Sequence, residues 1–116
     1  MEVYVNVKVF DLEMKRYEKV KLKVDTGATY TCIPKEILKR LNVRPFTKRK
    51  LRNFDGSVIE REVGVVIIEW DKSRAGVSVI FGEKDDAKVL GITALEQLGL
   101  KIDPITGKLE HYIPRQ

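Results

Sequence analysis

The sequence predicts a mainly β fold with two short helices, and three observations support this prediction. Apolar and polar residues alternate over residues 3–9 and again over 19–24, which is the period of half-buried strands. Residues 58–70 and 75–81 form two further strand-like runs, the first with a mostly apolar centre. Turn residues such as Gly, Asp and Pro separate these runs.

The first two strands form a hairpin in this prediction. Valine occupies alternate positions in the first strand, and lysine alternates with apolar residues in the second. The polar stretch 11–16 between them fits the connection of an antiparallel pair. Asp71–Arg74 turns the chain between the two long strands in the same way. Residues 101–103 and 108–113 flank a further turn, Pro104–Gly107.

Two segments carry helix signals. Pro34 suits the first turn of a helix. One apolar face then continues to about residue 42 through Ile33, Ile37, Leu38 and Leu41. Later in the chain, Thr93 and Glu96 fit a capping box that starts a second helix, and Gly99 fits its end. Both helices are short, so the chain is mainly β.

Composition limits the classes of function. The 116 residues contain no linker and no repeat, so we expect a single domain over residues 1–116. No apolar run approaches the roughly 20 residues of a membrane span, and the N-terminus lacks the pattern of a secretory signal. We therefore expect a soluble, cytoplasmic chain with no membrane partner. One cysteine, Cys32, and one histidine, His111, allow no internal disulfide and no multi-thiolate or paired-histidine site, so we expect no metal and no cofactor.

The most informative segment follows the second strand directly. Asp25 begins the tripeptide Asp-Thr-Gly, immediately after the apolar Val24. Gly27 supplies backbone freedom, and the small side chains around it allow another group to approach closely. Nearby backbone N–H groups would hold the carboxylate rigidly. Three residues alone also fit an ordinary strand-to-loop turn, so the tripeptide needs its context.

Two motifs, in this order, resemble the retroviral-type, or retropepsin-like, aspartic proteases, which are single-domain relatives of pepsin. The first motif is Val24–Ala28, and the second is the apolar-apolar-Gly run 89–91 ahead of the C-terminal helix. A flap-like hairpin at 51–59 and two strands separate them, as in that family. The resemblance covers about residues 3–103. It implies a closed β-barrel of the acid-protease type, and we expect a prokaryotic or archaeal member.

The resemblance implies an aspartic endopeptidase that hydrolyses peptide bonds in extended polypeptides. Two aspartates share a proton in this family and activate one water molecule. The chain has a single Asp-Thr-Gly, and 116 residues are too few for a two-lobed enzyme that carries both halves. The second aspartate would therefore come from a second copy in a two-fold homodimer, which would act on a peptide or an unfolded protein.

The resemblance also assigns a role to each residue of the segment 25–29, the active loop. Asp25 is the catalytic acid and base of each subunit. Thr26 would hydrogen-bond across the dimer, and the carbonyl of Gly27 would hold extended substrate. Ala28 would leave room beside the aspartates. Thr29 stands where many viral members carry an acidic or amide residue, and its hydroxyl can still hydrogen-bond.

Two further segments complete the predicted site. The hairpin over residues 52–58, signalled by Asp-Gly, would act as a flap that closes over substrate and excludes water. An ordinary surface hairpin gives the same sequence signal. The predicted flap residues are Asn53, Phe54, Asp55, Gly56, Ser57 and Val58, with Phe54 as apolar cover. The second active-site turn consists of Val89, Leu90 and Gly91.

Two other functions stay open in the sequence. A protease-like fold can serve as a catalytically inactive dimerisation or peptide-binding module. The net charge of +5 alone suits a basic nucleic-acid-binding barrel, but no recognition motif accompanies it, so we expect no specific nucleic acid partner. The basic run 47–52 fits a solvated strand that leads to the flap. If this run has a function, attracting acidic substrates to the cleft is a natural one.

Three side chains outside the motifs have simpler roles in this prediction. We expect Cys32 to be a buried structural residue, because the only histidine that could activate it lies near the C-terminus. His111 is expected to be solvated or to pack at the surface. Trp70 ends an apolar strand and is expected in the core or in an interface.

Overall fold

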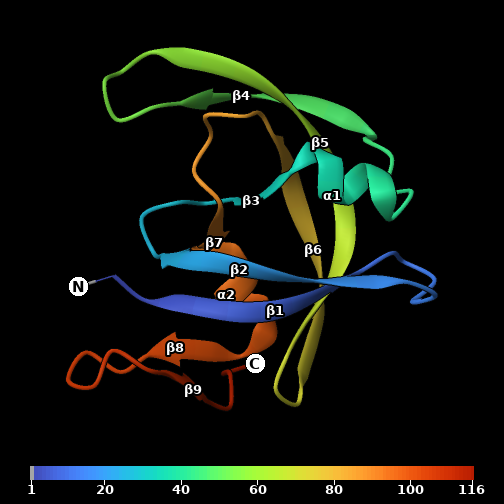
Figure 1. Ribbon diagram of the computed structural model, residues 1–116. Helices are drawn as coiled ribbons and strands as arrows, with labels where there is room; N and C mark the ends of the chain where they lie inside the picture. The colour runs from blue at the N-terminus through green and yellow to red at the C-terminus, as the bar shows by residue number, and fades with distance from the viewer. Residues whose placement is uncertain (1) are drawn as a thin grey trace.

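Residues 2–116 form nine strands and two short helices in the computed structural model (Figure 1). In chain order the elements are β1 (Tyr4–Phe10), β2 (Tyr17–Asp25), β3 (Thr31–Pro34), α1 (Lys35–Arg40), β4 (Thr47–Arg52), β5 (Val58–Trp70), β6 (Ser73–Gly82), β7 (Val89–Gly91), α2 (Ile92–Leu98), β8 (Leu100–Ile102) and β9 (Leu109–His111). Within residues 2–116, neither helix is long and apolar enough to cross a membrane. The mainly β prediction is confirmed.

Six strands close into a barrel in the order β1-β2-β7-β3-β6-β5, and β5 completes the ring by pairing with β1. The pairs β2–β7 and β3–β6 are parallel, whereas the other neighbours in the ring are antiparallel. Within the described residues β4 pairs with β5 alone, so it lies outside the ring. The closed barrel implied by the sequence resemblance is therefore confirmed.

Alternate side chains of β1 and β2 point into the barrel, as the sequence period predicted. Val5, Val7 and Val9 of β1 are buried, and Leu22 of β2 is completely so. All of β1 pairs antiparallel with residues 17–23 of β2, which confirms the predicted hairpin. Removing these apolar side chains from water is the main favourable term in folding. The same core continues through Val66, Ile68, Val77, Val79, Leu90, Ala94, Leu95 and Leu98.

The longest strand, β5, connects the barrel to an outer hairpin. Its first residues, Val58 to Val63, pair antiparallel with β4, and the rest of the strand pairs with β6 and β1. The β4–β5 hairpin is therefore a direct continuation of the barrel wall, and it crosses the upper part of the molecule in Figure 1. This continuity fixes the base of the hairpin while its tip extends beyond the barrel.

The sequence patterns do not predict β3, which pairs in parallel with β6. Four residues are too few to show a strand period, and Pro34 suggested a helix start. Pro34 instead keeps an extended backbone, with ψ of 133°, as the residue before α1. α1 ends at Arg40 rather than near residue 42, because the chain turns at Asn42, whose φ is +58°.

The predicted capping box at the start of α2 is wrong. The helix begins at Ile92 after Gly91, and no side chain caps it. Thr93 lies within the helix and is exposed. The loop after β2 supplies an acceptor instead, because the N–H of Ile92 donates to the carbonyl of Ala28 at 2.8 Å. Gly99 ends the helix in the left-handed conformation, as predicted.

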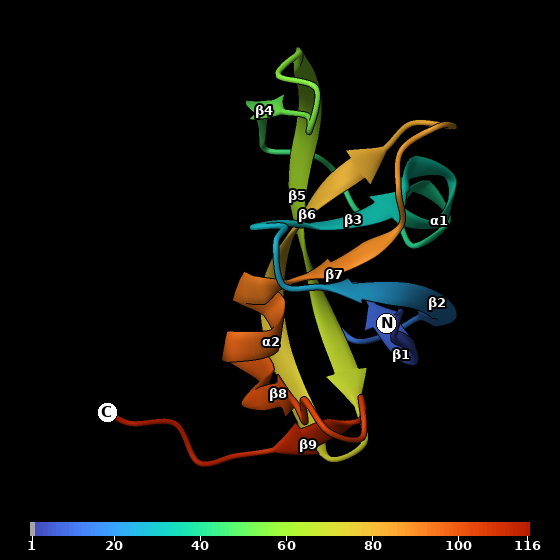
Figure 2. The ribbon, with the colours of Figure 1, turned by 90° about the vertical axis from the view of Figure 1, so that its left-hand side faces the viewer.

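A separate two-stranded sheet, β8 with β9, lies near the end of the chain. His111 connects this sheet to the β5–β6 turn. Its ring hydrogen-bonds to Asp71 at 2.8 Å and to Ser73 at 3.1 Å, and its centroid lies 5.3 Å from that of the half-buried Trp70. His111 therefore packs at the surface, which was one of its two expected roles. Beyond β9 the last residues extend away from the rest of the molecule (Figure 2).

Candidate active site

The candidate active site is built on the loop between β2 and β3. Asp25 is the last residue of β2, and its Oδ1 accepts the backbone N–H of Gly27 at 2.9 Å. The N–H of Ala28 donates to the carbonyl oxygen of Asp25 at 3.2 Å. A Cβ on Gly27 would lie 3.3 Å from Asp25 Oδ1, a tight contact that would press on the carboxylate. The turn holds the half-buried Asp25 in one orientation.

The strand β7 supports this loop from behind. β2 and β7 run parallel, and Asp25 pairs in register with Gly91. The N–H of Gly91 donates to the buried hydroxyl of Thr31 at 3.0 Å. A Cβ on Gly91 would lie 2.7 Å from the carbonyl carbon and oxygen of Tyr30, and 2.9 Å from the carbonyl oxygen of Ala28. These neighbours are backbone atoms, so only glycine lets β7 pass so close to the loop.

A cleft of about 430 Å³ opens beside Asp25, between the active loop and the β4–β5 hairpin. Its lining comes from the active loop, the hairpin, the strands β3, β6 and β7, and the β6–β7 connection. The apolar part of the lining consists of Ala28, Leu51, Ile59, Ile80, Ala87 and Val89. A concave, partly apolar surface next to a rigidly held carboxylate is typical of a ligand-binding site.

One ion pair lies in the wall of this cleft. Arg61 of β5 donates from Nε and one Nη to the two carboxylate oxygens of Asp86, at 2.7 and 2.9 Å. The two side chains are only 20% and 19% exposed. Asp86 also accepts the N–H of Glu83 at 2.7 Å. The Arg61 guanidinium holds the pKa of Asp86 below its usual range. The pair therefore ties the hairpin strand to the β6–β7 connection.

Cys32 lies in the same wall, and its expected burial is corrected to a half-buried position. Burial raises the pKa of its thiol to about 11, and the carboxylate of Asp86 adds to this effect. The thiol therefore stays protonated at neutral pH. A protonated, half-buried thiol fits a packing role and lacks the activation that a nucleophile requires.

The tip of the β4–β5 hairpin is an ordered turn. Asp55 accepts the hydroxyl of Ser57 at 2.6 Å and its N–H at 2.8 Å, and these hydrogen bonds lower the pKa of Asp55. Gly56 adopts a φ of +88°, which favours glycine, and Arg52 donates to its carbonyl at 3.0 Å. Phe54 is fully exposed, so it does not cover the cleft of its own chain.

The structure brings part of the predicted site together. The predicted residues that line the cleft are Asp25, Gly27, Ala28, Thr29, Asn53 and Val89. Thr26 is exposed on the active loop, whereas Leu90 and Gly91 lie buried behind it. The other predicted flap residues, 54–58, are exposed at and beside the hairpin tip, outside the cleft lining.

Several cleft residues were not among the sequence candidates. They include Tyr30, Arg61, Ile80, Asp86 and Ala87. The sequence pattern around Arg61 could have identified it as a site residue. Its neighbours on the same face of the strand, Ile59 and Val63, are both apolar. A charge on an apolar face predicts a buried partner. The sequence could not identify that partner as Asp86, which lies 25 positions away.

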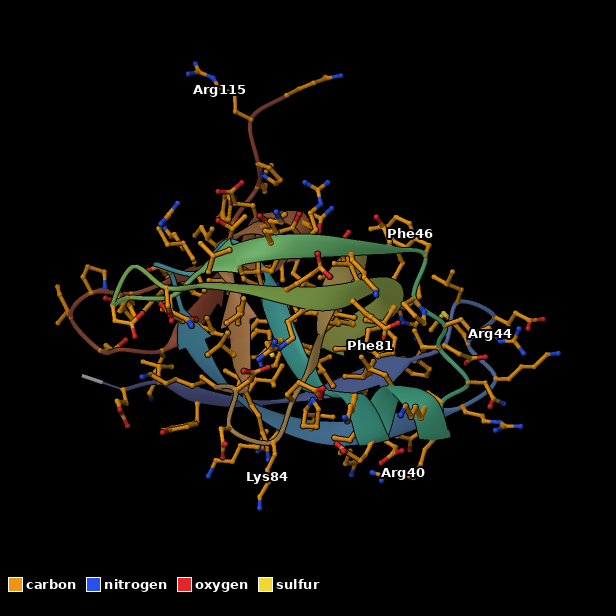
Figure 3. The ribbon with its side chains drawn as sticks, turned by 90° about the horizontal axis from the view of Figure 1, so that it is seen from above. Arg40, Arg44, Phe46, Phe81, Lys84 and Arg115 are labelled. Atoms are coloured by element: carbon orange, nitrogen blue, oxygen red, sulfur yellow. The ribbon has the colours of Figure 1, made fainter. Side chains whose placement is uncertain are left out.

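The side chains of the basic run 47–52 and of the residues just before it lie on different surfaces of the molecule. Lys50 and Arg52 line the cleft, whereas Lys48 lines a separate shallow hollow. Arg44 and Phe46 precede β4 and lie at the end of the molecule opposite the hairpin tip (Figure 3). Only part of this run can therefore contact a ligand in the cleft.

Known protein families and solved structures include proteins that are similar to this chain. Residues 11–97 match a family model described as "gag-polyprotein putative aspartyl protease". Comparison with curated proteins gives no match. Among solved structures, a retropepsin-like aspartic protease from Rickettsia conorii is 18% identical with a TM-score of 0.51, over 89% of this chain and 86% of that chain. The simian foamy virus (mac) protease in solution is 19% identical with a TM-score of 0.49, over 79% of this chain and 92% of that chain.

Substituting Gly91 tests how closely β7 supports the active loop. Gly91→Ala should lower the free energy of unfolding by about 1–3 kcal/mol, because the new Cβ would overlap backbone atoms of the loop. Gly76→Ala is the matched control, since its Cβ would meet no atom within 4 Å. That control should leave stability unchanged or raise it by up to about 1 kcal/mol. Equal effects of the two changes in chemical denaturation would contradict this view of the loop.

The Arg61–Asp86 pair should make stability depend on pH. The pKa of Asp86 is lower in the folded chain, so the pair stabilises the fold above the unfolded value of about 3.9 and this contribution is lost as pH falls below it. Asp86→Asn should lower the free energy of unfolding by about 1–3 kcal/mol at pH 7 and reduce its decline between about pH 5 and pH 2. The control Asp85→Asn, in the exposed neighbouring residue, should change neither. An unaltered pH profile for Asp86→Asn would refute the assignment.

Proposed function

The chain belongs to the retropepsin-like aspartic protease family, and from this premise we propose that it is an endopeptidase that cleaves extended polypeptides as a homodimer. The observation that carries the proposal is the position of Asp25. Its carboxylate is held by the backbone of its own loop and borders a cleft that the β4–β5 hairpin closes on the other side. This arrangement can place a peptide bond against a fixed carboxylate.

A second copy of the chain would complete the site. Aspartic proteolysis needs two carboxylates about 3 Å apart, and the active loop supplies one per chain. The loop and the hairpin tip lie on the same side of the molecule, at the left of Figure 1 and facing the viewer in Figure 2. Thr26 and Gly27 are exposed on that side. A two-fold axis beside the loop would then bring the two Asp25 side chains together.

In the proposed mechanism the two Asp25 carboxylates share one proton, because two negative charges at this separation are costly. The ionised carboxylate takes a proton from a water molecule, whose oxygen attacks the carbonyl carbon of the peptide bond. The protonated carboxyl gives its proton to the carbonyl oxygen, which produces a diol. One diol hydroxyl then returns its proton to the pair as the nitrogen takes a proton from the pair and the C–N bond breaks. The pair ends with the single proton it began with.

The neighbouring residues would position the substrate and the second loop. The carbonyl of Gly27 can accept an N–H of an extended peptide, and the hairpin backbone can pair with it as in strand addition. Ala28 keeps the space beside the carboxylates small and apolar. Thr26, exposed on the loop, can hydrogen-bond to the partner loop. The contacts of β7 with this loop would keep these groups in place during the reaction.

Asp25→Asn should lower the rate of proteolysis by about 10²–10⁴-fold, because the amide can neither take nor give the proton. Asp85→Asn is the matched control, since Asp85 is exposed and does not line the cleft. The assay follows hydrolysis of an unfolded protein from pH 3 to pH 8, with and without a statine-type transition-state mimic. Inhibitable cleavage that only Asp25→Asn removes supports the proposal. Binding of polypeptide without cleavage would instead favour an inactive peptide-binding module.

Mixing the same variants tests the shared site. Adding excess Asp25→Asn chain to a fixed, small amount of the unchanged chain should lower its activity, because mixed dimers contain only one Asp25. Substrate is kept in large excess so that binding by the variant does not deplete it. Adding Asp85→Asn chain should raise activity instead. A rate that stays constant in the presence of excess Asp25→Asn would rule out a dimeric site.

A further inference from the structure

We propose that the cleft selects polypeptides with an acidic side chain, which the outer strand β4 binds through Lys50 and Arg52. The inference rests on the proposed function and names the substrate class of that same site. It starts from the charges that line the cleft, which are the cations Lys50, Arg52 and Arg61 and the carboxylates of Asp25 and Asp86. Three of these five groups are already engaged.

The engaged groups are the ion pair and the catalytic carboxylate. Arg61 and Asp86 form a two-point pair at 2.7 and 2.9 Å, so their charges cancel inside the wall. Asp25 is oriented by the N–H of Gly27 and faces the water and the partner carboxylate in the proposed reaction. The charges left for a ligand to meet are therefore the two positive charges of β4 and the carboxylate of Asp25, and the Asp25→Asn chain used in the binding experiment lacks that carboxylate.

Lys50 and Arg52 are available to a ligand. Among residues 2–116 neither takes part in an ion pair, and both are exposed. Arg52 stands opposite Val58 in the hairpin register, so no carboxylate faces it there. Lys50 stands opposite Glu60, but the two form no ion pair. The hydrogen bond from Arg52 to the carbonyl of Gly56 orients the guanidinium without cancelling its charge.

The apolar lining indicates that the acidic group belongs to a polypeptide. Leu51, between the two cations, pairs with Ile59 across the hairpin, and both line the cleft. Successive side chains of an extended peptide point to opposite sides. Lys50 and Arg52 flank Leu51 in β4, so their side chains stand on the opposite face of that strand. A peptide that pairs with the edge of β4 and places an apolar side chain on the face of Leu51 and Ile59 therefore presents its neighbouring side chain on the face of Lys50 and Arg52. A glutamate carboxylate at that position can accept two hydrogen bonds from the guanidinium of Arg52. The ammonium group of Lys50 adds a second positive charge beside it.

The experiment measures binding by the inactive Asp25→Asn dimer, so its result does not depend on catalysis. Two fluorescent peptides of equal length are compared by anisotropy, one with glutamate and one with glutamine beside the same apolar residue. The glutamate peptide should bind about 3- to 10-fold more tightly at 50 mM salt. The preference should shrink at 300 mM salt, because ions screen exposed charges.

Two double variants of the inactive chain locate the effect. In Lys50→Gln/Arg52→Gln the preference for glutamate should fall to about 2-fold or less, since the two cations that contact the carboxylate are gone. Arg44→Gln/Lys48→Gln removes the same charge from residues outside the cleft and should retain the preference. If both double variants lose the preference for glutamate to the same extent, the preference comes from general surface charge and the proposal is overturned.

The remaining outcomes separate this inference from the proposed function. Equal binding of the two peptides, no binding of either, or equally tight binding of a single-stranded oligonucleotide would overturn the preference for acidic polypeptide. Cleavage of both peptides at equal rates by the unchanged chain would overturn it too, while leaving the endopeptidase proposal intact. Selective binding of the glutamate peptide without any cleavage would support the acidic preference and overturn the endopeptidase proposal.

Discussion

The close passage of Gly91 behind the backbone of Ala28 and Tyr30 is the contact on which the candidate site depends. Because the neighbouring atoms are backbone, this contact has little freedom to adjust, and it joins the active loop to the closed barrel. The N–H groups of Gly91 and Ile92 then donate to Thr31 and to the loop carbonyl of Ala28. The start of α2 therefore depends on the same loop that positions Asp25.

The electrostatics of the cleft follow from how this support is arranged. The β6–β7 connection leads directly into β7, and its Asp86 holds Arg61 of the outer hairpin. The barrel, the loop that carries Asp25 and the base of the hairpin are thus one connected unit, while the hairpin tip extends beyond it. Because Arg61 is paired with Asp86, the cations without an ion pair among the described cleft-lining residues are Lys50 and Arg52. A single polar contact thereby influences both the shape and the charge of the site.

The sequence could predict what depends on local pattern. The alternation in β1 and β2 predicted their buried face, and the glycine after Asp25 predicted a turn that orients the carboxylate by a backbone N–H. Contacts between distant segments could not be predicted. β3 is too short to show a period and exists because β6 pairs with it. The expected cap at Thr93 is absent, because the loop after β2 supplies an acceptor that no local motif reveals. The apolar neighbours of Arg61 indicated a buried partner, but only the fold identifies Asp86.

The central claim is that each chain holds half of an active site. The stoichiometry of a statine-type transition-state mimic tests this claim most directly, because the mimic occupies the position of the substrate between two aspartates. Isothermal titration calorimetry should give one mimic bound per two chains, together with a dimeric mass for the complex. Saturation at one mimic per chain, in a complex of monomeric mass, would contradict the account.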